Sequence, residues 1–386
     1  MDKAALAMLV AGLLLVTLAF VTPRSKRAPL PKGGAPVSVE TGAAQPEVEG
    51  RILIYVNGEL KYSGKVHSFL MPATPMLALG LFPTSGFQSA SVSLYGENPS
   101  TWPAELSGVQ TVTLYYGDHA AVESVWGVRS SIAPLVLVYD ASGNKWTEIS
   151  LSTTPSIFRN GTGVLLSVSG SVTPSLTQPT NVYMLRLVRP TCTRGFGYVG
   201  AVLATRLMED TLPSPVTVNP GDSLTVVYQF YFKADQIFTE NWARAFFAWL
   251  YNVPGAKIDV TATDGSTDYI DPYASDNNVP ANNAPVDCYI VVGDGQASFS
   301  RTAYRVVSEV ARAEPSVQVY GGGVSLSYAF TFSQDTTITE LAVYAKLRDG
   351  KEVMLLYYVL PQPAVAKAGI PFTVTFRINL PYADRV

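Results

Sequence analysis

Histidine and cysteine are scarce in this sequence of 386 residues, which contains two of each. Metal sites built from several histidines, and most schemes of general base catalysis, therefore have little material. A Ser-His-Asp arrangement can be drawn from His67 beside Ser68 and from His119 after Asp118. No G-x-S-x-G context accompanies either histidine. We expect a protein that is not an enzyme and has no organic cofactor.

Charge is also scarce, because only 15% of the residues are charged and the net charge is −3. No basic field is present to attract nucleic acid, so we expect no nucleic-acid partner. Tyrosine is abundant, with 21 residues, and together with β-branched residues it favours pleated, half-buried strands. A chain of this length suits two domains, each with its own core. The composition therefore predicts an all-β protein.

The two cysteines, Cys192 and Cys288, fall in different halves of the chain. In an oxidising or hyperthermophilic setting they would be able to form a disulfide that links the halves. Separate buried thiols fit the sequence equally well, because spacing along the chain does not reveal proximity in space. Both alternatives stay open.

The N-terminus carries the strongest local pattern. Residues 4–21 contain neither charge nor proline, and at about 1.5 Å per residue they would span most of a hydrocarbon core of about 30 Å. We therefore predict a transmembrane helix within residues 1–27, with a lipid membrane as its partner. The large apolar side chains of this anchor include Leu6, Leu9, Leu13, Leu14, Leu15 and Phe20.

Two other interpretations of the N-terminus stay open. A cleaved secretory signal would have a shorter apolar segment and a better cleavage site than residues 17–19 offer. Lys3 followed by Ala4 resembles the cleavage site of archaeal type IV pilin-like precursors, and this resemblance implies an apolar helix packed in a filament core.

The orientation of the anchor is not fixed by the sequence. Basic residues that follow the apolar segment favour a cytoplasmic position for the large domain, but this rule constrains a virion membrane less. These residues are Arg24, Lys26, Arg27 and Lys32. We expect a membrane-anchored protein on a virion surface or an extracellular face.

A Pro- and Gly-rich segment, residues 28–50, follows the anchor and predicts an extended linker. Within it Val37 and Val39 alternate with Ser38 and Glu40. This alternation fits a short strand, and an N-terminal strand of this kind sometimes completes the sheet of a neighbouring subunit. A plain spacer is the other interpretation of the same residues.

From residue 51 onward the pattern is that of β-strands separated by Gly, Pro, Asn and Ser. Asn57-Gly58, the preferred dipeptide of a two-residue turn, predicts a hairpin of residues 51–56 and 59–62. Short strands at close spacing indicate antiparallel β-sandwiches of the jelly-roll kind. Further strands are predicted at residues 90–95, 109–116, 134–139, 146–151, 164–172 and 182–188.

Two segments are apolar at helical spacing instead, residues 69–82 and 238–252. In the second, Thr239 stands where a helix N-cap is expected. Trp242, Phe246, Trp249 and Leu250 fall on one stripe of this helix. The stripe fits a ligand pocket, or a helix that packs on a sheet, which is the more common use of such a pattern.

Blocks of the sequence occur twice in the same order. Residues 155–167 align without a gap with residues 315–327, and residues 212–230 align with residues 360–378. The shared positions are turn glycines and alternating strand residues, which belong to a structural framework. We therefore predict an internal duplication, with one sandwich domain at residues 51–232 and a second at residues 233–386.

Acidic residues cluster once, in a loop rich in Asp and Asn. Their oxygen atoms are the ligands that calcium prefers, although the spacing is not that of an EF-hand; a solvated surface loop is the alternative. The acidic residues are Asp264, Asp268, Asp271 and Asp276. Elsewhere, Asn160 begins an Asn-Gly-Thr glycosylation sequon, which has a meaning only outside the cytoplasm.

The closing strands, ITE-L-x-VY at residues 338–344, MLLYYVLP at 354–361 and G-x-x-FTVTF at 369–376, resemble those of β-sandwich surface proteins of virions. The opening, residues 52–69, also resembles the start of such domains, and the apolar N-terminus is similar to that of surface proteins of archaeal viruses. This resemblance to spike, turret or tail-fibre proteins implies a structural or receptor-facing role and no catalytic residue.

We therefore expect a non-enzymatic, membrane-anchored structural protein of a virion that presents its sandwiches for assembly or host attachment. Its expected partners are the membrane, further copies of itself or other structural subunits, and a host receptor or glycan. The alternative is a subunit of an archaeal surface filament, or an adhesin, that assembles by strand exchange.

Overall fold

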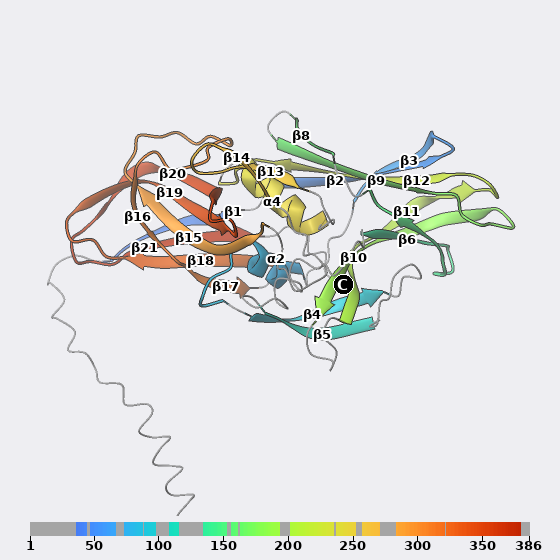
Figure 1. The fold of residues 1–386 in the computed structure, drawn as a ribbon, viewed down its shortest axis with the longest axis horizontal. Coiled ribbons are helices and arrows are strands. Elements are labelled where there is room, and N and C mark those ends of the chain that lie inside the picture. Colours follow the sequence, from blue (N-terminus) through green and yellow to red (C-terminus); the bar gives the residue numbers. More distant parts are fainter. Residues whose placement is uncertain are drawn as a thin grey trace, which may run out of the picture.

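The computed structural model describes residues 36–44, 47–66, 73–87, 89–97, 108–115, 134–152, 156–160, 163–193, 201–234, 237–251, 257–270, 283–320 and 322–379. In these ranges the chain forms several β-sheets and two helices (Figure 1), so the expected all-β class is confirmed. No helix within them is long and apolar enough to cross a membrane. The predicted anchor, residues 4–21, lies outside the described ranges.

Strands from the first part of the chain form a five-stranded and a six-stranded sheet. Their orders are β3-β2-β12-β9-β8 and β5-β4-β11-β10-β6-β7. The strands are β2 (Glu47–Val56), β3 (Glu59–Lys65), β4 (Ser89–Glu97), β5 (Gly108–Tyr115), β6 (Leu135–Tyr139), β7 (Lys145–Ser150), β8 (Ser156–Asn160), β9 (Gly163–Val172), β10 (Thr180–Thr193), β11 (Ala201–Val218) and β12 (Leu224–Lys233).

Strands from the second part form two four-stranded sheets and one small hairpin, and they lie on the left of Figure 1. The orders of the large sheets are β1-β21-β18-β17 and β16-β15-β19-β20, where β1 comes from the N-terminal end of the chain. The strands are β1 (Val37–Ala44), β13 (Ile258–Thr261), β14 (Thr267–Ile270), β15 (Pro285–Gly293), β16 (Glu309–Ala313), β17 (Ser316–Tyr320), β18 (Gly323–Phe330), β19 (Thr336–Leu347), β20 (Glu352–Ala366) and β21 (Phe372–Asn379).

Seven consecutive strands of each part occupy the same relative places. β12-β9-β8 and β11-β10-β6-β7 in the first part correspond to β21-β18-β17 and β20-β19-β15-β16 in the second. The register of one hairpin also agrees, because Ile157 faces Leu166 and Val317 faces Leu326, each 160 residues later (317 − 157 and 326 − 166).

Alternation along the last strand of each set decides which side chains enter the core. In β12 every second residue from Leu224 to Phe232 is buried, and in β21 the same holds from Phe372 to Ile378. Since successive side chains of a strand point to opposite faces, one apolar face of each strand covers the core. The alternating residues shared by the repeated blocks predict these inward positions, and the burial confirms them.

The predicted hairpin at Asn57-Gly58 is present and joins β2 to β3. Both turn residues have positive φ, 52° at Asn57 and 78° at Gly58, as a type I′ turn requires. The Asn57 amide nitrogen donates to Asp222 at 2.7 Å, and its amide oxygen accepts from the Ser223 N–H at 2.9 Å. The turn is therefore tied to the connection between β11 and β12.

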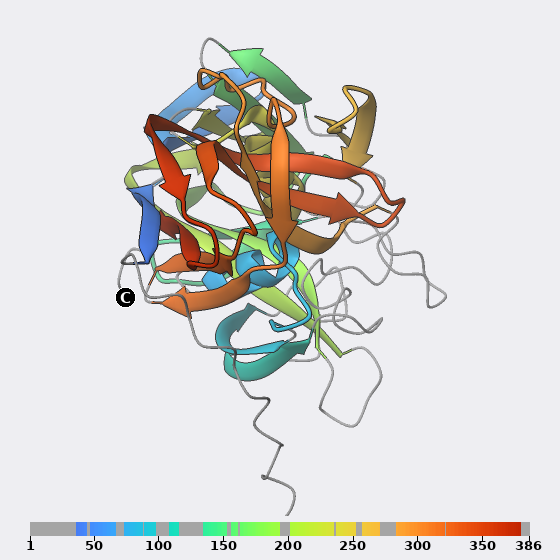
Figure 2. The same cartoon turned by 90° about the vertical axis from the view of Figure 1, so that its left-hand side faces the viewer.

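Two helices, α2 (Ala73–Leu81) and α4 (Glu240–Tyr251), lie between the two groups of strands (Figure 1). Figure 2 shows the molecule with the second group of strands towards the viewer. Thr239 caps α4 as predicted, because its hydroxyl accepts from the Trp242 N–H at 3.1 Å. Trp242, Phe246 and Trp249 are all buried; Trp242 stacks on Phe246, and Phe246 makes a tilted ring contact with Trp249. Of the two uses predicted for the aromatic stripe, packing on the sheets is the one observed.

One hydrophobic core runs through both groups of strands. The same buried cluster contains Leu166 of β9, Phe82 beside α2, Trp242 of α4 and Leu326 of β18. Phe82 stacks on Trp242 with 5.6 Å between the ring centres. Because the helices fill the space between the sheets, the two groups of strands share apolar contacts.

Part of the predicted linker is structured. Residues 37–44 form β1 and β2 begins at Glu47, so the plain spacer is wrong for these residues and the strand alternative is right. Only residues 45 and 46 separate the two strands. These residues form a strand because tertiary contacts stabilise it: the apolar side chains of β1 pack against the hydrophobic core.

Candidate functional site

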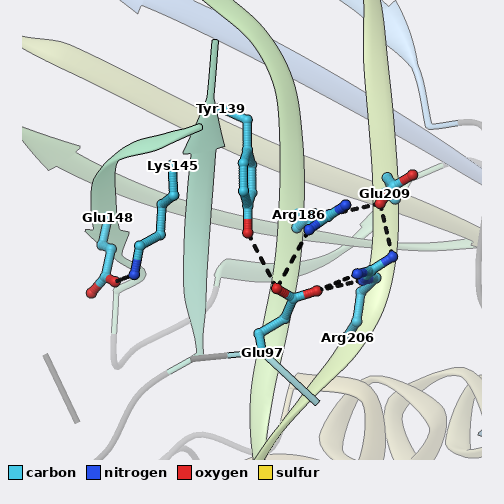
Figure 3. A network of polar contacts seen from close by, with 7 residues as sticks. All are labelled: Glu97, Tyr139, Lys145, Glu148, Arg186, Arg206 and Glu209. Atoms are coloured by element: carbon cyan, nitrogen blue, oxygen red, sulfur yellow. Dashed lines mark hydrogen bonds and ion pairs between the residues drawn. The ribbon is translucent and has the colours of Figure 1, made fainter. Parts of the chain in front are cut away.

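A charged cluster lies on the six-stranded sheet, where four strands contribute one network (Figure 3). Glu97 at the end of β4 accepts from Arg206 of β11 at 2.5 Å and contacts Arg186 of β10 at 3.5 Å. Glu209 bridges the same two arginines, at 2.6 Å from Arg186 and 2.9 Å from Arg206. Two carboxylates and two guanidinium groups therefore neutralise one another.

Tyr139 of β6 completes this network. Its hydroxyl donates to Glu97 at 3.2 Å, and the Arg186 guanidinium lies 4.5 Å from its ring centre. Burial, and then the charge of Glu97, raise the pKa of Tyr139 above its usual value. Burial lowers the pKa of Arg186, but Glu97 and Glu209 outweigh it, so this pKa is raised. The charge-assisted hydrogen bonds of this network cross-link four strands of the sheet.

A second carboxylate is fully buried in the other group of strands. Glu340 of β19 accepts from the N–H groups of Val307 and Ser308 at 2.9 and 3.1 Å, and from the Tyr357 hydroxyl at 2.8 Å. These donors belong to the segment before β16 and to β20. Burial, followed by the hydrogen bond to Glu340, raises the pKa of Tyr357, so the tyrosine stays a donor. Glu340 is a structural acceptor that closes the connection from β15 to β16.

A hollow of about 210 Å³ lies between α4 and the β13–β14 hairpin. Two of its polar side chains bind the backbone of β13. Asn241 exchanges two hydrogen bonds with the Thr261 backbone at 2.8 and 2.9 Å, and Arg244 donates to the Asp259 carbonyl at 3.1 Å. These contacts fix the hairpin against the helix.

The predicted acidic loop is described in part. Asp264 accepts from the Ser266 N–H and hydroxyl at 2.8 and 2.6 Å, and these bonds lower its pKa. Asp268 is buried near Asn283, which donates to Asp349 at 3.1 Å, and burial raises the pKa of Asp268. Within the described ranges no three acidic, histidine or cysteine side chains form a group that could hold a metal.

Several predicted residues fall outside the described part of the chain. They include Asp271, Asp276, His67, His119 and the apolar residues of the anchor. Asn160 ends β8, but its side chain is not described. Cys288 is a free, fully buried thiol in β15. The Cys192 side chain is not described, so both alternatives for the two cysteines stay predictions.

The contact between β1 and β21 stands apart from every other strand pairing. It is the one parallel pair in the described sheets, and it joins Val37 with Phe372 and Glu40 with Thr375. The register shifts between Glu40 and Ala43, where Gly42 has a φ of 73°. Glu40 also forms an ion pair with Arg377 at 2.5 Å. This seam, defined as residues 37–40 with 372–375, is the candidate interaction site.

The sequence indicated the seam only through the alternation at residues 37–40, and it gave no partner for that strand. It gave no indication of the charged network, because the members are spread over residues 97 to 209 without a recurring spacing. Glu340 did have a local signal that was missed, namely a single carboxylate inside the apolar strand ITELAVYAKL. A buried charge in such a strand is usually held by several donors.

Comparison with known proteins provides no family for this chain. No protein-family model matches it, and no curated protein matches it. Among solved structures, 2'-deoxycytidine 5'-triphosphate deaminase from Agrobacterium tumefaciens is 8% identical, with 77% of this chain and 90% of that chain covered and a TM-score of 0.10. A likeness of this size carries no argument about fold or activity.

Proposed function

We propose that this chain is a non-enzymatic, membrane-anchored structural protein that presents two tandem, duplicated β-sandwiches at a virion surface, for assembly or host attachment. The observation that carries the proposal is the repeated strand order, since seven strands of each part take the same places. The matched hairpin register of Ile157 with Leu166 and Val317 with Leu326 supports a duplication in addition. The repeated features are strands and turns, and among the described residues no polar site is repeated with them, as we expect of a structural subunit.

The polar clusters support a structural role as well. The carboxylates of Glu97 and Glu209 are paired with arginines, and Glu340 is bound by three donors. Groups that are engaged in this way stabilise the fold and are not available as nucleophiles or bases. The membrane anchor is proposed from residues 4–21 of the sequence alone.

A subunit of a cell-surface filament is the second candidate, and the β1–β21 seam is the observation that favours it. An N-terminal strand that completes a distant sheet is the device by which extended assemblies link their subunits. In both candidates the sandwiches act by contact with membranes, with further copies or with a host receptor or glycan.

The location of the protein tests the two candidates. Antibodies against residues 237–379 are used for immunogold electron microscopy of producing cells and of the particles that they release, with mass spectrometry of purified particles. Abundant protein in the particles supports the virion proposal, and label on cell-attached fibres supports the filament. Protein that is absent from both would refute both. Deletion of residues 4–21 should move the protein from the membrane pellet to the supernatant.

A further inference from the structure

Among the described residues, the second group of strands has no strand of its own on the side of β21 that β1 covers. In the first group, the corresponding last strand, β12, pairs with β9 on one side and with the antiparallel β2 on the other. β21 pairs with β18 on one side, and its other side is filled by β1, which is some 330 residues distant in sequence (372 − 37 = 335). The described elements that directly precede β15 are a helix and the small β13–β14 hairpin.

We propose that residues 37–40 are an exchangeable strand, which completes the β21 edge of a second copy of this chain as well as of its own. The inference rests on the proposed role in assembly and names the partner, a second copy, and the surface that it offers. When β1 leaves, the β21 edge presents unpaired N–H and C=O groups to any extended segment. Because this parallel strand comes from the far end of the chain, the same strand of another copy can pair with β21 equally well.

The contacts of the seam stabilise residues 37–40 on β21 and set their register, but they do not determine whether the strand comes from the same chain or from another copy. Val37 and Val39 are half-buried and pack on the apolar core, while Glu40 pairs with Arg377. The Arg377 and Glu40 side chains remain 51% and 43% exposed. An exposed ion pair of this kind contributes little to stability, so it aligns the strand without holding it tightly. Four register pairs precede the bulge and two follow it, Ala43 with Arg377 and Ala44 with Ile378, so an exchange opens six pairs.

The bulge provides the hinge. Gly42 adopts a positive φ that favours glycine, and the pairing register breaks at this point. If residues 41–46 extend, with loss of the pairs that Ala43 and Ala44 form with β21, the seven residue steps from Glu40 to Glu47 reach at most about 25 Å. A donor must therefore place the start of its β2 within about 25 Å of the β21 that it completes. The exchange thus brings the first sandwich of one copy against the second sandwich of the next.

Cross-linking between two different chains tests the inference. Ser38 faces Thr373 across the seam, and both side chains are on the outer face, where neighbouring strands allow a disulfide. Full-length chains carrying S38C and full-length chains carrying T373C are co-expressed, and their membranes are oxidised. Within one chain each variant has only half of the pair, so a 38–373 disulfide can form only by exchange.

The expected result is a covalent dimer that contains the 38–373 linked peptides, at least tenfold more abundant than the linked product from S38C with T375C, in which the register is displaced by two residues. The double variant S38C/T373C is the positive control for disulfide formation, because its two cysteines can form the bond within one chain or between two chains. A double variant that closes only within one chain, with no linked dimer from the mixture, would overturn the exchange. Absence of the bond in both would also overturn it.

Failure of this experiment is distinguishable from failure of the proposed function. A protein found in particles or on fibres without the linked dimer would be a structural subunit whose β1 serves its own chain. Intrinsic fluorescence of the buried tryptophans, compared with that of the parent protein, establishes that each variant is folded. We expect each variant to fold, because the side chains of Ser38 and Thr373 lie on the outer face of the sheet.

Discussion

Glu340→Ala should destabilise the second group of strands more than any exposed carboxylate substitution. The side chain is fully buried and accepts from Val307, Ser308 and Tyr357. Its removal leaves three donors without an acceptor, at about 1 to 2 kcal/mol each. The sum is about 3 to 6 kcal/mol, and at about 2 to 4 °C per kcal/mol a middle value of about 4 kcal/mol lowers Tm by about 8 to 16 °C.

The assay is thermal unfolding of the full chain in mild detergent, followed by tryptophan fluorescence. Glu340→Gln retains an acceptor for the two backbone N–H groups and should lose less, about 1 to 2 kcal/mol. Glu59→Ala removes a carboxylate whose side chain is 73% exposed and serves as the matched control, with no expected change in Tm. A Glu340→Ala variant that unfolds within 2 °C of the parent would refute the view that this carboxylate holds the three donors.

Three further predictions concern the same framework. Gly295→Ala should cost about 2 kcal/mol or more in a urea titration, because an added Cβ would lie 2.5 Å from the Val307 Cβ and 2.6 Å from the Glu340 carboxylate; parent-like stability would contradict this packing. Thr239→Ala should cost about 1 to 2 kcal/mol in the same titration, whereas Thr239→Ser, which keeps the hydroxyl that caps α4, should cost less; equal losses would argue against the cap. Burial raises the pKa of Tyr344 from 10.0 to about 12, so its neutral form stabilises the fold below pH 10 and that contribution is lost as the pH rises from 10 to 12. Stability measured at pH 9, 10 and 11 should therefore fall less steeply in Tyr344→Phe, and parallel slopes would oppose this assignment.

Local features of the fold could be predicted from the sequence because their causes are local. The Asn57-Gly58 turn needs two residues with positive φ, and the dipeptide supplies them. The helix after Thr239 has its cap and its apolar stripe within a dozen residues. The alternation in β12 and β21 follows from the period of a strand.

Features that depend on distant partners could not be predicted. Glu97 meets Arg206 across 109 residues, and no spacing rule connects them. The strand at residues 37–40 was weighed against a spacer because the four residues alone cannot reveal a partner at Phe372. Tertiary contacts decide such segments, since a short strand has no stability of its own.

The distance along the chain between β1 and β21 has a consequence for the order of folding. β1 leaves the ribosome early, and its pairing partner at Phe372 follows 335 residues later (372 − 37). At about 5 to 20 residues per second, synthesis of that interval takes about 17 to 70 s. Throughout this time the first strand has no pairing partner within its own chain. The first strand is therefore most accessible to pairing with a neighbouring copy while its own chain is being synthesised.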